Sequence, residues 1–189
     1  MNTSDIRAAL TLDNHARPKL GGVFSYDQVV RNLTEENERI YVFNTQPSLR
    51  PGEHWMVFAT RNSEVHYFDS FGRHPRMYPQ LSNKMEGMFK TIYWNNTSFQ
   101  SPSTTVCGDY TVIFALLFAR GHGLQDIVNW FAAFPNSEVR DHTLRSMLVK
   151  AYGDELFACY REDRPGLSGA QNLHVDRVAK TIGQPCIFH

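Results

Sequence analysis

One cysteine in the sequence stands where its side chain can act as a nucleophile. Cys107 separates a polar loop, QSPSTTV, from a long apolar run that predicts a helix. Free backbone N–H groups and the positive end of the helix dipole lie at a helix N-terminus, and both lower the pKa of a thiol. The position therefore indicates a thiolate; the alternative is a small buried apolar residue, which is what most free cysteines are.

A thiolate nucleophile requires a base within hydrogen-bond distance and a third group that orients the base. His54 is the candidate base among the eight histidines, because it opens a predicted core strand, GEHWMVF, whose end projects rigidly toward a neighbouring loop or helix end. His66 is a poor partner for Asp69, since alternation along their strand places the two side chains on opposite faces.

Two further polar residues complete a candidate catalytic set. Asp69 stands at the end of the strand expected to pair with the His54 strand, and an imidazole neighbour would explain a carboxylate that is costly to bury alone. The alternative is a turn carboxylate that caps the corner at 70–72. Gln100 lies seven residues before Cys107, and its amide can donate to an oxyanion together with the backbone N–H of Cys107.

Strands and helices alternate in a pattern that predicts an α+β fold, with a mixed sheet packed against the helix that Cys107 begins. The strands at 55–61 and 64–71 are close enough in sequence to form a hairpin. The helix at 107–120 is hydrophobic nearly all round, which is typical of the middle of a core. The other expected strands are 21–24, 39–44 and 91–94, and the other expected helices are 4–10, 26–33, 124–134 and 137–152, with a short helix after residue 80.

Local signals indicate how some helices begin and which side they expose. Ser4 is expected to cap the first helix, and Ser25 with Gln28 forms a capping box for the second. The helix at 137–152 is expected to present a solvated charged face, formed by Arg140, Asp141 and Arg145.

The composition is that of one folded domain. The chain has 189 residues, of which 42% are hydrophobic, and 153–189 is expected to be a C-terminal extension of this domain with a possible helix at 171–182. Lys plus Arg and Asp plus Glu number 19 each, so a basic field that would bind nucleic acid is not indicated. Three cysteines without a Cys-x-x-Cys pair oppose a disulfide framework and a cysteine zinc site, and no cofactor is expected.

The sequence also lacks the signals of membrane insertion and secretion. No run approaches the roughly 20 apolar residues of a membrane-spanning helix. The first residues lack the basic end and the apolar block of a signal peptide. The expectation is a soluble protein made inside a cell, without a membrane partner.

Three segments together resemble the adenovirus-type cysteine proteases and the wider group that contains the SUMO- and ubiquitin-like-protein proteases. The order of residues matches, with His-Trp on a strand, an acid before Ser-Phe-Gly, and Gln seven residues before Cys-Gly. The resemblance extends in outline over about residues 20–133, and its specific motifs lie within 44–118. The segments are NTQPSLRPGEHWMVF, VHYFDSFG and FQSPSTTVCGDYTVIF.

The resemblance implies a papain-like catalytic arrangement reached in a different chain order. It gives His54 the role of general base, Asp69 that of the orienting acid, Gln100 that of the oxyanion donor and Cys107 that of the nucleophile. Trp55 would pack beside the imidazole and shield it. The version in this chain is most similar to proteases of double-jelly-roll DNA viruses and related mobile elements, such as virophages and polintons.

This resemblance implies a viral cysteine endopeptidase that cleaves capsid or core precursor proteins during particle maturation, near small residues and often glycine. Such a protein would be a monomer that acts in the infected host cell and is packaged in the virion. The alternatives are an isopeptidase that removes ubiquitin-like modifiers from host proteins, and an inactive descendant that serves as a scaffold.

Two departures from the adenoviral enzyme limit what the resemblance implies. That enzyme has Glu where this chain has Asp69, a difference that the wider family accommodates. It is activated by a disulfide-linked peptide and by DNA, but no cysteine shortly precedes Gln100 here and the net charge is zero, so neither activator is expected. Asp109 also places a negative charge two residues after Cys107, which opposes thiolate formation unless the carboxylate points away.

Overall fold

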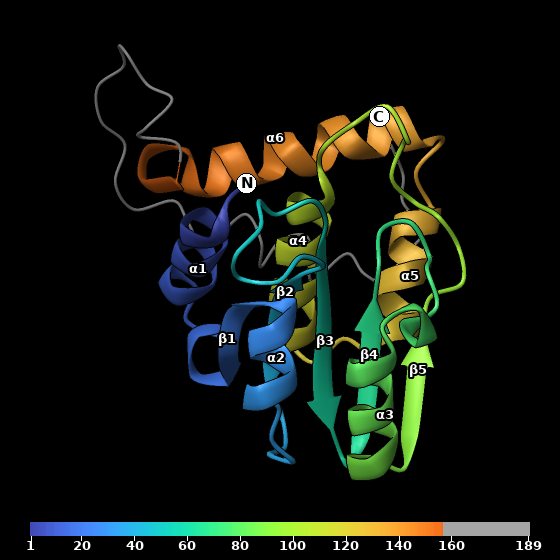
Figure 1. Cartoon of the computed structure of the whole chain (residues 1–189). Coiled ribbons are helices and arrows are strands. Elements are labelled where there is room, and N and C mark those ends of the chain that lie inside the picture. The colour runs from blue at the N-terminus through green and yellow to red at the C-terminus, as the bar shows by residue number, and fades with distance from the viewer. Residues whose placement is uncertain (157–189) are drawn as a thin grey trace.

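The structure is a computed structural model, and residues 1–156 are described. A five-stranded sheet with the order β1-β2-β3-β4-β5 runs through its middle (Figure 1). β1 with β2 and β4 with β5 are parallel pairs, whereas β3 is antiparallel to both of its neighbours, so the predicted α+β fold with a mixed sheet is confirmed. The strands are β1 (Leu20–Ser25), β2 (Ile40–Asn44), β3 (Trp55–Arg61), β4 (Glu64–Phe68) and β5 (Thr91–Trp94).

Helices cover both faces of this sheet (Figure 1). α2 and α3 pack on one face, and α1, α4, α5 and α6 form the larger core on the other. The helices are α1 (Thr3–Leu12), α2 (Tyr26–Asn32), α3 (Pro79–Met88), α4 (Cys107–Ala119), α5 (Leu124–Ala132) and α6 (Ser137–Leu156), with short 3-10 turns at Arg17–Lys19 and Pro75–Met77.

β3 is buried on both faces, which fixes the position of the residue that precedes it. Its side chains alternate, with Val57 and Ala59 in the core that contains α4, and Met56 and Phe58 in the core beneath α2 and α3. The apolar residues of β3 therefore pack into the cores on both sides of the sheet. The strand begins immediately after His54, so this histidine is attached to one of the most enclosed segments of the molecule.

α4 is the central helix that the sequence predicts. All of its 13 residues are buried, and the aromatic side chains of Phe114 and Phe118 pack in its core. The helix begins at Cys107, and its N-cap residue, Val106, makes no side-chain capping hydrogen bond. Cys107 therefore occupies a helix N-terminus without a capping side chain, where backbone donors favour a negative charge.

Two predicted boundaries are wrong for local reasons. α1 is capped by Asn2 rather than Ser4, because the Asn2 carboxamide accepts from the Asp5 N–H and the Asp5 carboxylate accepts from the Asn2 N–H. β4 ends at Phe68 rather than at residue 71, because the Asp69 carbonyl and carboxylate accept hydrogen bonds from the next residues of the chain and form a turn. The capping box of α2 at Ser25 is present as predicted.

At the C-terminal side, α6 extends to Leu156, beyond the predicted end at residue 152, so the expected extension begins inside this helix. The possible helix at 171–182, Cys159 and Cys186 lie outside the described residues. Within residues 1–156, none of the helices is both long and apolar enough to cross a membrane.

Candidate active site

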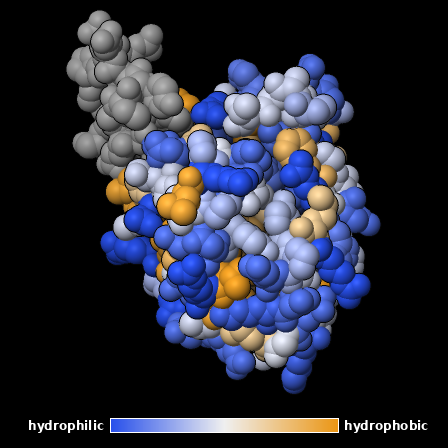
Figure 2. All heavy atoms as spheres, in the orientation of Figure 1, coloured by the Kyte–Doolittle hydropathy of each residue, from blue (hydrophilic) through white to orange (hydrophobic). Residues whose placement is uncertain are grey.

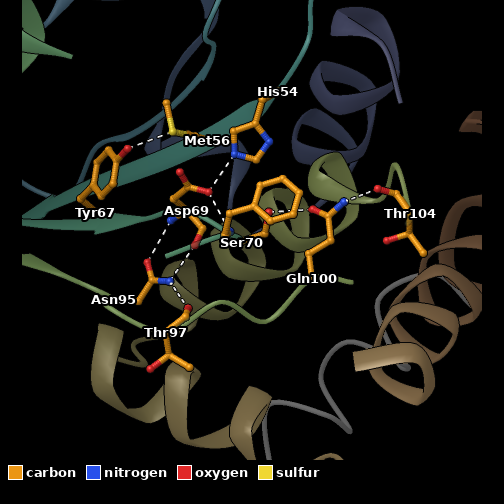
Figure 3. Close-up of polar contacts among 10 residues, drawn as sticks. His54, Met56, Tyr67, Asp69, Ser70, Asn95, Thr97, Gln100 and Thr104 are labelled. Carbon is orange, nitrogen blue, oxygen red and sulfur yellow. Dashed lines mark hydrogen bonds and ion pairs between the residues drawn. The ribbon is translucent and has the colours of Figure 1, made fainter. Parts of the chain in front are cut away.

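The four residues that the sequence singles out lie together at one end of the sheet, and Figure 3 shows three of them, His54, Asp69 and Gln100. Val57 of β3 pairs with Phe68 of β4, so the chain that enters β3 and the chain that leaves β4 are neighbours at this end. A cleft of about 470 Å³ opens there, and the N-terminus of α4 forms part of its wall. Its lining residues include His54, Gln100 and Cys107, while Asp69 lies buried behind the imidazole.

His54 and Asp69 form a buried pair. His54 Nε2 lies 2.8 Å from Asp69 Oδ1, and the two residues are 5% and 0% exposed. The same Oδ1 accepts the backbone N–H of Phe71 at 2.8 Å, which closes the turn after β4. Asp69 therefore satisfies both interpretations of its sequence position, as the partner of the imidazole and as a turn carboxylate.

The surroundings of His54 and Cys107 favour an imidazolium–thiolate pair. Burial alone lowers the pKa of His54, but the hydrogen bonds with Asp69 and Cys107 outweigh burial and raise this pKa to about 9. Burial alone raises the pKa of Cys107, but the hydrogen bond with His54 and those with the backbone of Trp55 and Gly108 lower it overall. Both shifts favour the state in which the imidazole carries the proton and the sulfur carries the negative charge.

Gln100 is held at both ends of its side-chain amide. Its Oε1 accepts a hydrogen bond of 2.8 Å from Ser70 Oγ, and its Nε2 donates one of 2.7 Å to the Thr104 carbonyl (Figure 3). The hydroxyl and the carbonyl fix which end of the amide is the donor. One N–H of the Gln100 amide is thus bonded to the loop that leads to Cys107. The second N–H of the same amide is left for a ligand, in a side chain that lines the cleft.

Loss of this fixed amide is expected to slow the chemical step. For the oxyanion donor that the sequence resemblance implies, Gln100→Ala should lower kcat by about 10²-fold with little change in KM, because such a donor acts in the transition state. Ser70→Ala should lower kcat by about fivefold to tenfold, since it removes the hydrogen bond that orients the amide. Both constants are measured on a fluorogenic peptide built on a cleavage site identified by mass spectrometry.

The double variant tests whether Ser70 acts through Gln100. Ser70→Ala combined with Gln100→Ala should be no slower than Gln100→Ala alone, because the serine then has nothing to orient. Additive losses would contradict the positioning role. Alkylation of Cys107 by iodoacetamide is the control and should be unchanged in all three variants, because it requires the thiolate and no oxyanion donor.

Asn95 holds the backbone of Asp69 and was missed by sequence reasoning. It is 3% exposed, its Oδ1 accepts the Asp69 N–H at 2.9 Å, and its Nδ2 donates to the Asp69 carbonyl at 2.6 Å. It also donates to the Thr97 carbonyl at 3.1 Å. The sequence carries one weak signal for it, a polar residue directly after the strand that lies beside β4.

The prediction of a solvated face on α6 is wrong for two of its three residues. Asp141 is 3% exposed and accepts hydrogen bonds from Ser101 N, Thr104 Oγ1 and Tyr110 Oη. Arg140 is also buried and donates to the carbonyls of residues 99 and 131. The loop before Cys107 lacks regular structure, so its polar groups need partners, and α6 supplies them. α6 thus supports the loop that presents Gln100.

The expected place of Trp55 beside the imidazole is taken by Phe71. The Phe71 ring centroid lies 5.0 Å from that of His54, while the described residues show no ring contact between Trp55 and His54. Trp55 belongs to the core that contains α4, and its indole N–H donates to the Met1 carbonyl at 3.1 Å. The reason is strand alternation, which turns consecutive residues at this strand end in opposite directions.

Asp109 directs its charge away from the thiolate and toward α6. Its Oδ2 lies 2.6 Å from Arg145 Nε, whose side chain is half-buried. Burial raises the pKa of Asp109 to about 6, and the guanidinium of Arg145 acts in the opposite direction. The first turn of α4 therefore contains a carboxyl group that accepts a proton in mildly acidic solution.

This raised pKa predicts a pH-dependent stability. Between about pH 4 and pH 6 the folded state binds more protons at Asp109 than the unfolded state, so the free energy of unfolding falls as the pH rises through this window. Asp109→Asn should remove this fall, which is on the order of 2 kcal/mol. Urea unfolding at several pH values measures it, with the exposed Glu35→Gln as control. Parallel pH profiles for wild type and Asp109→Asn would contradict the prediction.

No group of three or more His, Cys, Asp or Glu side chains within residues 1–156 is arranged to hold a metal ion. Cys107 is a free thiol.

No protein-family model matches the sequence, and no curated protein matches it either.

Proposed function

We propose that the protein is a cysteine endopeptidase in which Cys107 is the nucleophile and His54 the general acid and base. The observation that carries the proposal is the position of His54, which is hydrogen-bonded to buried Asp69 and shares the cleft with Cys107, at the N-terminus of a buried helix. A cysteine that only fills space in the core needs no neighbouring imidazole, whereas a nucleophilic cysteine needs a base that a third group orients.

The arrangement supports acyl transfer in two steps. The Cys107 thiolate attacks the scissile carbonyl carbon, and the resulting oxyanion accepts hydrogen bonds from Gln100 and from the backbone N–H of Cys107. The His54 imidazolium gives its proton to the departing amine, which leaves a thioester. His54 then takes a proton from a water molecule that attacks the thioester, and collapse of the second oxyanion releases the acid and restores the thiolate.

The order of the residues along the chain and in the fold supports an adenain-like protease within the wider SUMO- and ubiquitin-like-protein protease group. His54 precedes β3, Asp69 follows β4, and Cys107 begins the central helix. The corresponding biological role is cleavage of viral capsid or core precursors during virion maturation, in the infected cell and within the particle. Cleavage next to small residues such as glycine belongs to the same proposal.

The test is to identify peptide bonds that the purified protein cleaves. Candidate capsid precursors and a panel of fluorogenic ubiquitin-like substrates are incubated with it, and new N-termini are mapped by mass spectrometry. The matched control is the same preparation after alkylation of Cys107 with iodoacetamide. The proposal predicts new termini in the precursors that are absent from the control.

Two results would overturn parts of the proposal. Efficient turnover of the ubiquitin-like panel alone would replace the maturation role with that of an isopeptidase, with the same chemistry. The absence of any Cys107-dependent cleavage, in a protein whose Cys107 reacts rapidly with iodoacetamide, would contradict the peptidase and favour an inactive scaffold.

A further inference from the structure

A second pocket of about 450 Å³ adjoins the catalytic cleft. Met1, Gly52 and Trp55 line both cavities, so the two lie next to each other. The walls of the second pocket come from α1, from β1 with the start of α2, and from the loop at 45–53 that precedes His54. A polypeptide bound at Cys107 that extends past Met1, Gly52 and Trp55 would lie against these walls.

The lining of this second pocket is positively charged. Arg7 and Arg50 line it, and no Asp or Glu among the described residues does. The Arg7 guanidinium donates to the Val23 carbonyl at 3.2 Å, which leaves most of its donors available. Within residues 1–156 neither arginine forms an ion pair with a carboxylate. The pocket thus contains two guanidinium groups that are not paired with a carboxylate in the described part of the chain.

The loop that carries Arg50 is held in place by its own hydrogen bonds. Asn44 Oδ1 accepts the N–H of Gln46 at 3.0 Å and that of Glu53 at 3.2 Å, which joins the two ends of the loop. In the middle of the loop, the Ser48 N–H and hydroxyl donate to the carboxylate of Asp27. This carboxylate, the nearest negative charge along α2, is therefore engaged in fixing the loop.

The floor of the pocket also contains an unsatisfied donor. Asn44 is 5% exposed, lines the pocket, and has no hydrogen-bond partner for its Nδ2 in the described part of the chain. Gly52 lies directly over this amide, since a Cβ at Gly52 would stand 2.5 Å from Asn44 Nδ2. The pocket therefore contains a buried amide donor without a described partner, in addition to the two guanidinium groups.

The face of the molecule shown in Figure 2 is largely hydrophilic, and its apolar patches are small and separate. Leu49, 97% exposed, lies next to Arg50 at the tip of the same loop. Recognition at this end of the molecule is thus favoured by charge rather than by an extended apolar contact.

We infer that the second pocket is a specificity subsite that binds an acidic side chain, Asp or Glu, of the polypeptide substrate at a fixed distance from the scissile bond. The inference rests on the proposed peptidase activity and names one feature of its substrates. Arginine forks bind carboxylates through paired charge-assisted hydrogen bonds, which distinguishes Asp from the isosteric Asn.

The test profiles cleavage of a peptide library made from a digested proteome. With the wild-type protein, Asp and Glu should be enriched at one position relative to the cleaved bond, with about a tenfold preference over Asn and Gln. Arg7→Glu and Arg50→Glu should abolish this preference, and the double variant should favour Lys or Arg at the same position. Arg17→Glu, which replaces an exposed arginine outside the pocket, should keep the wild-type preference.

The outcomes separate the subsite from the peptidase. Cleavage without acidic enrichment, or with the same enrichment in the variants, would overturn the subsite and leave the peptidase intact. The absence of Cys107-dependent cleavage by the wild-type protein would overturn both. The rate of Cys107 alkylation and the melting temperature report whether each variant is folded. Where a Glu variant is unfolded, the Gln variants replace it and should weaken the preference without reversing it.

Discussion

Replacing Cys107 with Ala is expected to abolish the proposed peptide-bond cleavage, with a loss of about 10⁶-fold in kcat, as for removal of the nucleophile in a covalent protease. The described part of the cleft contains no second thiol, so no neighbouring group can form the thioester. The measurement is the number of new N-termini generated from the digested-proteome peptides. Cleavage at the wild-type rate by Cys107→Ala would show that the proposed nucleophile is wrong.

The control for this variant is its stability. Cys107 is nearly buried at the first turn of α4, and alanine fills most of its volume and is a good helix former. Cys107→Ala should therefore unfold in urea close to the wild-type midpoint. Loss of cleavage together with an unchanged midpoint assigns the effect to chemistry rather than to folding.

Replacing His54 with Ala is expected to lower kcat by a comparable factor and, in addition, to change the reactivity of Cys107. Its hydrogen bond is the largest influence that lowers the thiol pKa, so the pKa of Cys107 should rise in the variant. Iodoacetamide alkylation near pH 7 should slow by about tenfold or more, because less thiolate is present. At a pH above the raised thiol pKa the alkylation rate should recover, while cleavage should not.

The pH profile of the wild-type protein provides the second part of this test. Since the pKa of His54 is raised to about 9, the imidazolium is lost only above that pH. Cleavage should fall there because the leaving amine no longer receives a proton, whereas alkylation should continue because it needs only the thiolate. The exposed His15→Ala is the matched control and should retain both profiles. A cleavage rate that is flat through pH 9 would contradict the role of His54 as general acid.

The sequence predicts those parts of the fold and site that depend on local patterns. Strand β3 and the first residue of α4 follow from the apolar runs at 55–61 and 107–119. The contact of His54 with Asp69 follows from the hairpin, because pairing of β3 with β4 brings the ends of both segments together. In these segments the pattern of apolar residues and the short connection between the strands leave few alternative secondary structures or strand pairings.

The supports of the site depend on partners that are distant in sequence. Asp141 binds the loop before Cys107 across about 40 positions of chain, and Asn95 reaches Asp69 across 26. A charged residue on an amphipathic helix looks the same in sequence whether it faces water or a polar loop, so periodicity alone placed Asp141 in solvent. Whether Asp141 is buried depends on the polar backbone groups of the loop before Cys107, and the directions of these groups are known only in the folded chain.

The enclosure of α4 has a consequence for how this protein can diversify. The helix that begins at Cys107 has no side that faces water, so most substitutions along it alter the packing of the whole molecule. The side chains of Arg7 and Arg50, by contrast, are exposed, and substitutions there cost little stability. Under the proposed function, substrate preferences can therefore change at exposed positions such as Arg7 and Arg50 without repacking of the core that holds Cys107.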